Sequence, residues 1–124
     1  MKDNAVLDKS KQFAVRAIKL YQYLTTKKKE FIISKQLFRS GTSIGANVKE
    51  AQGAQSRKDF RTKLNIALKE AKESEYWLEL LNETGYLSKK EYDSIVRDCD
   101  EINRLLVAII KTTNYKLKTS NSTF

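Results

Sequence analysis

The amino-acid sequence predicts an all-α protein that folds as one antiparallel, up-down-up-down four-helix bundle. Three observations support this prediction. Apolar residues recur at steps of three and four in four separate segments, the spacing that gives a helix one apolar face. The chain contains no proline, so no helix is interrupted by one. Because a chain of 124 residues fits a single core, we expect one domain over residues 1–113.

The first two helices are predicted at about residues 8–26 and 31–52. Their core-facing sides comprise Phe13, Ala14, Ala17, Ile18, Tyr21 and Leu24, then Ile33, Leu37, Ser40, Ile44, Val48 and Ala51, the second being small and polar in the middle. Gly41 and Gly45 lie inside the second helix, where each costs about 1 kcal/mol relative to alanine. We attribute them to the close approach of a neighbouring helix. Gly53 is expected to end this helix in the position that follows the C-cap.

The last two helices are predicted at about residues 57–84 and 89–112. Ser56 with Asp59, and Ser88 with Glu91, have the spacing of helix N-terminal caps, and the short turn at Gly85 makes the two helices antiparallel. Their core-facing sides comprise Phe60, Leu64, Ala67, Ala71, Ser74, Leu78 and Leu81, then Tyr92, Ile95, Cys99, Ile102, Leu106 and Ile109. Residues 114–124 are rich in Ser, Thr, Asn and Lys, so we expect a polar, partly disordered tail.

The composition argues against catalysis. There is no histidine and only one cysteine, Cys99, so a catalytic triad and the common metal sites lack their usual members. The stretch SGTSIGAN has the spacing of neither phosphate-binding loop, GxxxxGK(S/T) or GxGxxG, and it lies within a predicted helix. Glu70, Glu73, Glu79 and Glu83 have the helical neighbours Lys69 and Lys72 and are interpreted as a solvated, salt-bridged face. We therefore predict no enzyme activity, no cofactor, no metal, and a buried structural thiol at Cys99.

The charge distribution points to an anionic partner. The formal net charge is +9, and residues 1–62 hold 14 Lys or Arg against 5 Asp or Glu. Clustered cations bind the phosphates of RNA or DNA by releasing counterions, although an ordinary soluble surface is the alternative. The candidate nucleic-acid-binding residues are Lys35, Arg39, Lys49, Arg57, Lys58, Arg61 and Lys63. With no long apolar run and no leader pattern, a cytoplasmic protein without membrane association is expected.

A row of polar residues follows one side of the second helix. Arg39, Ser43, Asn47 and Glu50 are spaced by four, four and three residues, so they share one side. Since half-buried polar groups need partners, we expect an interhelical network that includes Arg61 or Glu75 of the third helix. The alternative is that Arg39 belongs to the basic surface.

The third helix also carries apolar residues outside its core stripe. Ile66, Tyr76, Trp77 and Leu80 project away from the stripe when the helix is drawn at 100° per residue. Exposed apolar patches on soluble proteins often mark association sites. We predict that this face contacts another subunit of a homo-oligomer. Trp77 lies near the edge of the stripe and fits either the core or the interface.

The segment FRSGTSIGANVKEAQGAQSRKDFRTKLNIALKEAKESEYWLELL resembles the four-helix-bundle family of proteins encoded in 23S rRNA intervening sequences. The resemblance covers about residues 10–113, and Ala51 replaces the glycine that usually follows the second-helix glutamate. The matching positions are Arg39, Ser43, Ile44, Asn47, Glu50, Ser56, Phe60, Ala67, Glu75, Leu78, Gly85, Tyr86 and Leu87.

This resemblance implies a bacterial bundle that assembles as a ring-shaped pentamer. Relatives include the accessory protein of diversity-generating retroelements, a basic pentameric barrel that works with a reverse transcriptase and nucleic acid. We therefore expect a non-enzymatic homo-oligomer that binds RNA or other nucleic acid through its basic surface. The alternative is a protein-interaction scaffold that presents helices to an acidic, unidentified protein partner.

Overall fold

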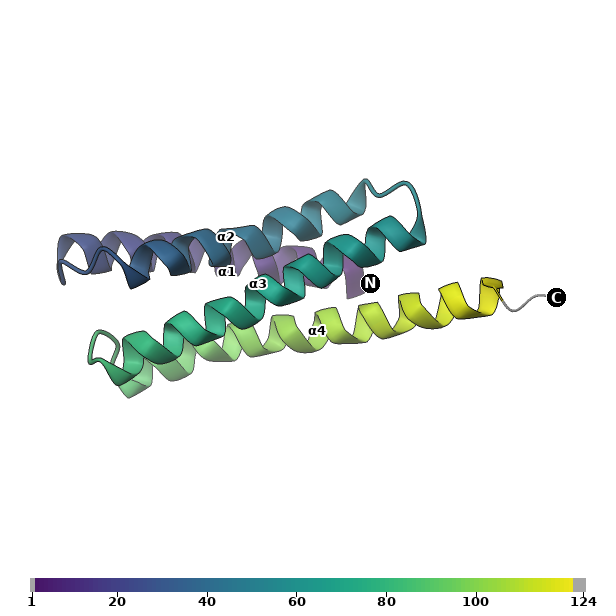
Figure 1. Cartoon of the computed structure of the whole chain (residues 1–124). Helices are drawn as coiled ribbons and strands as arrows, with labels where there is room; N and C mark the ends of the chain where they lie inside the picture. The colour runs from purple at the N-terminus through teal and green to yellow at the C-terminus, as the bar shows by residue number, and fades with distance from the viewer. Residues whose placement is uncertain (1, 122–124) are drawn as a thin grey trace.

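The computed structural model describes residues 2–121, and side chains over 5–119, as four helices. These are α1 (Lys2–Thr26), α2 (Ile33–Gln52), α3 (Arg57–Glu83) and α4 (Lys89–Asn121). Successive helices run in opposite directions, with the α1–α2 pair lying over the α3–α4 pair (Figure 1). α1 packs against α2 and α4, and α3 packs against the same two helices. The predicted all-α four-helix bundle is confirmed.

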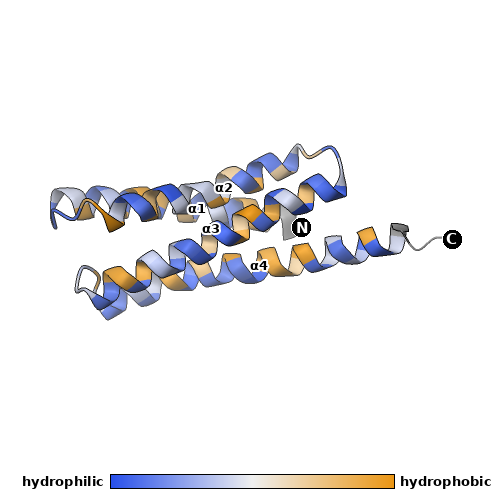
Figure 2. Cartoon of the chain, in the orientation of Figure 1, coloured by the Kyte–Doolittle hydropathy of each residue, from blue (hydrophilic) through white to orange (hydrophobic). Residues whose placement is uncertain are grey.

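The core is built from the predicted apolar faces. The hydrophobic positions of each helix form stripes broken by hydrophilic ones (Figure 2), and Phe13, Ile44, Leu78 and Leu106 are fully buried. Cys99 is also fully buried and donates a hydrogen bond from Sγ to the Ala71 carbonyl oxygen at 3.3 Å. Burial raises the pKa of this thiol to about 12, so Cys99 is a structural residue, as predicted.

The two glycines inside α2 allow α1 to approach closely, as the sequence predicts. A Cβ atom built on Gly41 would lie 2.7 Å from Ala17 Cβ and 3.4 Å from Phe13 Cε2. One built on Gly45 would lie 3.4 Å from the Ser10 carbonyl oxygen, an ordinary contact distance. Gly41 is therefore required by packing, whereas the contact at Gly45 is less demanding.

The predicted caps of α3 and α4 are present. Ser56 Oγ accepts a hydrogen bond from the Asp59 N–H at 3.0 Å. At α4, Ser88 Oγ accepts from the Glu91 N–H at 3.1 Å, and Glu91 Oε1 accepts from the Ser88 N–H at 2.8 Å. Gly85 has a φ of +85°, the left-handed conformation that ends α3. Reciprocal caps and a left-handed glycine explain why the α3–α4 hairpin was predictable.

Two helices extend beyond their predicted ends. α1 begins at Lys2, because Val6 continues the apolar face and is buried. α4 continues to Asn121, so residues 114–121 of the predicted tail are helical. Thr113 is buried and Leu117 is half-buried, and their spacing from Ile109 continues the core stripe through a polar composition. The predicted tail residues 122–124 lie outside the described residues.

The start of α2 depends on Glu30, a residue that the sequence analysis did not identify. Glu30 is only 7% exposed, and its carboxylate accepts hydrogen bonds from the backbone N–H groups of Ile32, Ile33 and Ser34 at 3.0, 2.9 and 2.7 Å. Burial acts to raise its pKa, but these backbone donors outweigh burial and hold the pKa of Glu30 below its ordinary value. The carboxylate thus satisfies the donors at this helix end.

Across the described residues, none of the four helices combines the length and apolar character needed to cross a lipid bilayer.

Candidate functional site

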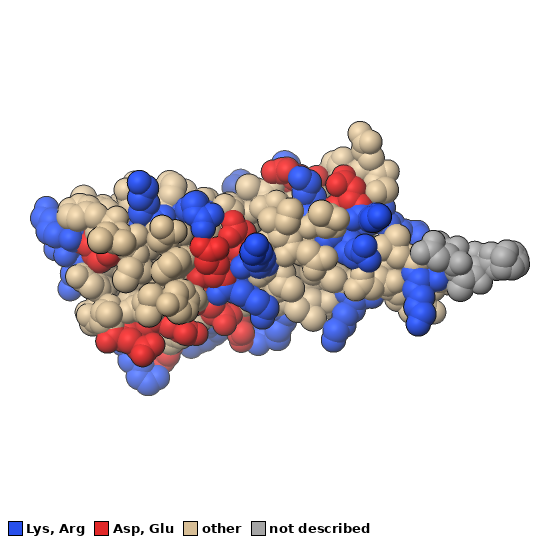
Figure 3. Space-filling model, in the orientation of Figure 1, with Lys and Arg blue, Asp and Glu red and all other residues tan. Residues whose placement is uncertain are grey.

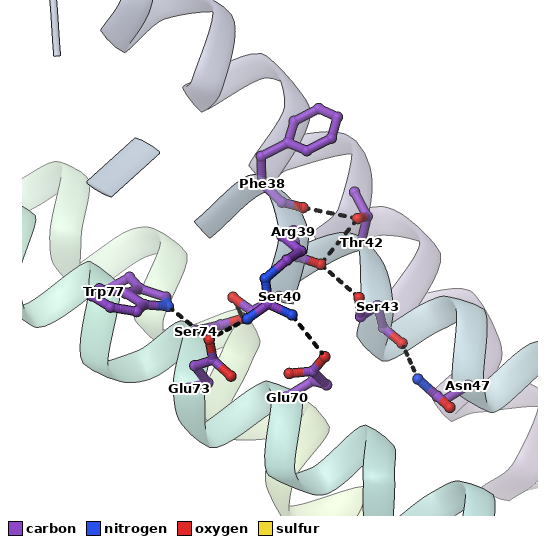
Figure 4. A network of polar contacts seen from close by, with 10 residues as sticks. All are labelled: Phe38, Arg39, Ser40, Thr42, Ser43, Asn47, Glu70, Glu73, Ser74 and Trp77. Carbon is purple, nitrogen blue, oxygen red and sulfur yellow. Dashed lines mark hydrogen bonds and ion pairs between the residues drawn. The ribbon is translucent and has the colours of Figure 1, made fainter. Parts of the chain in front are cut away.

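The most connected polar cluster lies between α2 and α3, where Arg39 faces two carboxylates (Figure 4). Arg39 Nη2 lies 2.5 Å from Glu73 Oε1, and Arg39 Nη1 lies 3.6 Å from Glu70 Oε2. Trp77 Nε1 donates to the same Glu73 oxygen at 3.3 Å. We call Arg39, Glu70, Glu73 and Trp77 the seam cluster. It ties α2 to two successive turns of α3.

The two carboxylates of the seam cluster have opposite pKa shifts. Burial and the neighbouring Glu73 carboxylate raise the pKa of Glu70 above its ordinary value, against the attraction of Arg39. For Glu73, burial acts in the same direction, but hydrogen bonds from Trp77, Glu70 and Arg39 together hold its pKa below the ordinary value. On acidification Glu70 therefore takes up a proton before Glu73, and Arg39 keeps its closer partner.

The rest of the predicted polar row bonds mainly within its own helix. Ser43 Oγ donates to the Arg39 carbonyl oxygen at 2.7 Å, and Asn47 Nδ2 donates to the Ser43 carbonyl oxygen at 2.8 Å. Glu50 does reach α3, where its Oε1 lies 3.0 Å from Lys63 Nζ. The row therefore contains two interhelical ion pairs, at Arg39 and Glu50, and local bonds that link Arg39, Ser43 and Asn47.

Glu75 and Arg61 have different partners from those predicted. Glu75 Oε2 accepts from Asn103 Nδ2 at 2.6 Å, and Arg61 Nη1 donates to Asn114 Oδ1 at 3.3 Å. Both partners lie on α4, so neither residue joins the row on α2. The expectation that they complete the α2 network is wrong, because both lie on the side of α3 that faces α4.

Glu70 and Glu73 are the residues that sequence reasoning missed. Their side chains are only 14% and 29% exposed, whereas a solvated face was expected. A usable signal was present, since Glu73 lies four residues before Trp77 and beside the core stripe. That spacing indicates a half-buried carboxylate with an indole donor, but its arginine partner depends on how α2 and α3 pack.

The seven candidate nucleic-acid-binding residues do not form one surface. Lys35 lies near the start of α2, whereas Lys49 lies near its end, where α3 begins. Arg39 and Lys63 have carboxylate partners. Arg57, Lys58 and Arg61 lie in the first turns of α3. The structure thus brings five of the seven to the end of the bundle where α2 ends, namely Lys49, Arg57, Lys58, Arg61 and Lys63.

Charge is segregated along the α3–α4 hairpin. All 10 acidic residues of the second half of the chain lie within residues 70–101, at the turn end of the hairpin and its middle. Residues 57–69 hold 5 Lys or Arg against 1 Asp, and residues 102–121 hold 4 against none. Because α3 and α4 are antiparallel, these two stretches lie at the same end, which we call the basic end (Figure 3).

The candidate oligomer residues divide into two pairs. Tyr76 is 52% exposed and Ile66 is 39% exposed. Leu80 is half-buried, and Trp77 is half-buried against the core. The rings of Tyr76 and Trp77 meet edge to face with centroids 5.1 Å apart. Trp77 therefore belongs to the edge of the core, and Tyr76 extends the apolar surface outward from it.

A metal centre has no support from the side-chain arrangement. Within the described part of the chain, no group of three or more Cys, Asp or Glu side chains is placed to hold a metal ion. In the seam cluster, the two carboxylates already share the Arg39 guanidinium as their counter-charge.

Comparison with known proteins gives a family and no established activity. The model of the family described as 23S rRNA-intervening sequence protein matches residues 2–108. A crystal structure of a protein with unknown function from the S23 ribosomal protein family of Bacteroides thetaiotaomicron is 62% identical, with a TM-score of 0.88 over 90% of this chain and 99% of that one. No curated protein matches. The chain therefore belongs to the 23S rRNA-intervening sequence protein family.

Proposed function

We propose that this protein is a non-enzymatic homo-oligomer that binds the backbone of RNA or other nucleic acid through its basic end. The observation that carries the proposal is the charge segregation of the α3–α4 hairpin, which gathers cations from both helices where residues 102–121 contain no acidic residue. Such a cluster gains affinity for phosphates by counterion release. A cytoplasmic location agrees with a nucleic-acid partner.

Self-association would strengthen this binding. Each subunit of a ring would present one basic end, and linked weak sites gain avidity when they engage one strand together. The exposed Tyr76 beside Trp77 on the outer side of α3 is the surface we propose for the subunit contact.

The test is fluorescence anisotropy of a labelled RNA at about 50 and 200 mM salt, the range over which phosphate contacts lose affinity steeply. The test variant combines Lys58→Gln, Lys111→Gln and Lys118→Gln, which removes three exposed cations of the basic end. We expect weaker binding and a log–log salt slope about two less steep, since each phosphate contact contributes about 0.7 for single strands.

The matched control combines Lys27→Gln, Lys28→Gln and Lys29→Gln, which removes the same charge from the exposed turn between α1 and α2 at the opposite end. Equal losses of RNA affinity in both triple variants would mean that binding depends only on net charge, and would contradict a site at the basic end. Absence of any salt-dependent binding by the unmodified protein would contradict the proposed function.

A protein-interaction scaffold is the second candidate, and one observation favours it. Phe31 is 58% exposed and Ile32 is 77% exposed, and only the buried Glu30 separates them from three exposed lysines. A basic turn with two exposed apolar side chains fits an acidic protein surface that offers an apolar contact. Salt-resistant binding of an acidic protein, lost on changing Phe31 and Ile32 to serine, would support this candidate.

A further inference from the structure

A groove crosses the basic end between α3 and α4. It encloses about 490 Å³ and is lined by Arg61, Thr62, Asn65, Ile66 and Lys69 of α3 and by Ile110 and Asn114 of α4. It has two cations and two carboxamides, and no carboxylate lines it. A second groove along the same two helices, of about 370 Å³, is lined by Glu75, Glu79, Tyr92, Asp93, Val96, Arg97 and Asp100. The first groove therefore has a lining of net positive charge and the second a lining of net negative charge.

The basic-end groove has hydrogen-bond donors to offer a ligand. Arg61 is oriented by its bond to Asn114 Oδ1, and the Asn114 amide nitrogen has no hydrogen bond to another described residue. Among the described residues, the side chains of Lys69 and Asn65 form no hydrogen bond or ion pair within the chain. Two cations with neighbouring amide donors match the chemistry of a phosphodiester group.

An exposed tyrosine follows one of the groove residues along α4. Tyr115 directly follows the groove residue Asn114 and is 71% exposed. Lys111, Tyr115 and Lys118 are spaced by four and three residues, so they share one face of α4. An aromatic ring between two lysines is the arrangement that binds single strands, since bases stack on the ring while cations follow the backbone.

We infer that the basic end binds a single-stranded segment of nucleic acid, with one backbone phosphate between Arg61 and Lys69 and a neighbouring base stacked on Tyr115. This inference rests on the proposed function and adds the kind of strand. In a duplex the bases are already stacked on each other, so Tyr115 has nothing to contact. Because every base has a π-face, binding is independent of sequence.

The experiment measures binding of a short single-stranded RNA, the same sequence as single-stranded DNA, and an RNA duplex. Tyr115→Ala should weaken binding to the single strand roughly tenfold without changing the salt slope, whereas Tyr115→Phe should retain it. Tyr23→Ala, at an exposed tyrosine near the other end of the bundle, is the matched control and should have no effect. The DNA probe shows whether a deoxyribose strand binds as tightly as a ribose strand of the same sequence.

The phosphate part is tested by the double variant Arg61→Gln with Lys69→Gln, which should weaken binding to the single strand and lower the salt slope by about 1.4. Lys72→Gln with Arg97→Gln removes the same charge from the acidic half of the hairpin and should change binding less than twofold. If the double variant unfolds, the single variant Lys69→Gln, at an exposed position, replaces it in the same measurement.

The outcomes are separable. Strong, salt-dependent binding of the unmodified protein that resists both Tyr115→Ala and the double variant would overturn this inference and leave the proposed function standing. Preference for the duplex with no effect of Tyr115→Ala would also overturn it. No binding to any of the three probes would overturn both.

Discussion

At the residue scale, a pair of serine hydroxyls joins α2 to α3 inside the core. Ser40 and Ser74 are fully buried, and their Oγ atoms lie 2.8 Å apart. Each hydroxyl satisfies the other, so the pair costs little as long as both members are present.

This arrangement predicts strong non-additivity. Ser40→Ala and Ser74→Ala should each lower the free energy of unfolding by about 1–3 kcal/mol, because the remaining hydroxyl is buried without a partner. The double variant should cost clearly less than the sum of the two. Urea unfolding of the unmodified protein, the two single variants and the double variant gives the coupling free energy between the two serines. Additive losses of stability would contradict the predicted coupling. Thr42→Val removes a hydroxyl that donates only to carbonyl oxygens of α2 and is the control.

Glu30 is the residue that makes the fold sensitive to acid. Its pKa is lower in the folded chain than in the unfolded one, where a glutamate titrates near about 4.3. The ionised carboxylate therefore stabilises the fold above that value, and the contribution is lost as the pH falls through the lower, folded pKa.

Glu30→Gln should accordingly lower the free energy of unfolding by about 0.5–2 kcal/mol at pH 7, the range for a lost helix cap, and by much less at low pH. Urea unfolding at neutral and acidic pH measures both. Glu83→Gln, at an exposed carboxylate, should change neither value appreciably. An equal loss from Glu30→Gln at both pH values would show that its charge is unimportant.

Single residues differ in how far the sequence predicts them. Core positions such as Leu64 and Cys99 were predictable, because helical periodicity alone assigns them to a face. The partners of Arg39, Glu75 and Arg61 were not, because they depend on the rotation of one helix about its axis relative to the next. An interhelical ion pair can therefore be expected from sequence, but its members need the packed structure.

At the element scale, α1 packs so closely against α2 that position 41 has no room for a side chain. Gly41→Ala should lower the free energy of unfolding by about 1–3 kcal/mol, because the new methyl group would overlap Ala17. Gly45→Ala fits at ordinary contact distance, so it should be neutral or stabilise by up to about 1 kcal/mol through helix propensity. Thermal and urea unfolding of this matched pair tests the packing, and a reversed order of stability would contradict it.

Helix ends were predictable where the turn chemistry is local. Ser56, Ser88 and Gly85 act within a few residues, and each functions as predicted. The C-terminal part of α4 was missed because Ser, Thr and Asn favour turns, whereas contact with the bundle at Thr113 and Leu117 favours continuation. Tertiary contact outweighs the weak local preference there, and the groove residue Asn114 lies in that extension.

At the scale of the whole molecule, antiparallel topology produces the basic end. Counting charges by halves of the chain places the excess in residues 1–62 and finds the second half neutral. The fold brings the start of α3 beside the end of α4, so the neutral half is in fact strongly polarised. The charge pattern of the sequence therefore indicates a basic end only when the antiparallel pairing of α3 with α4 is taken into account.

Self-association is tested at the same scale. Tyr76→Ser combined with Leu80→Ser should reduce an assembly to smaller species, since it removes the exposed and half-buried apolar side chains from the outer side of α3. Light scattering coupled to gel filtration measures the mass against 14.3 kDa for one chain, and circular dichroism checks that the helices remain. Val15→Ser, at an exposed position of α1, is the control. An unchanged mass would exclude this face as the interface.

The order of helix contacts also sets how quickly the chain can fold. Three of the four contacting pairs join helices that are consecutive in sequence, and only α1 with α4 spans the chain. Bundles dominated by such local contacts fold in about microseconds to milliseconds. Refolding after a rapid denaturant jump should therefore finish before subunits meet, so any slower phase that speeds up with protein concentration reports assembly.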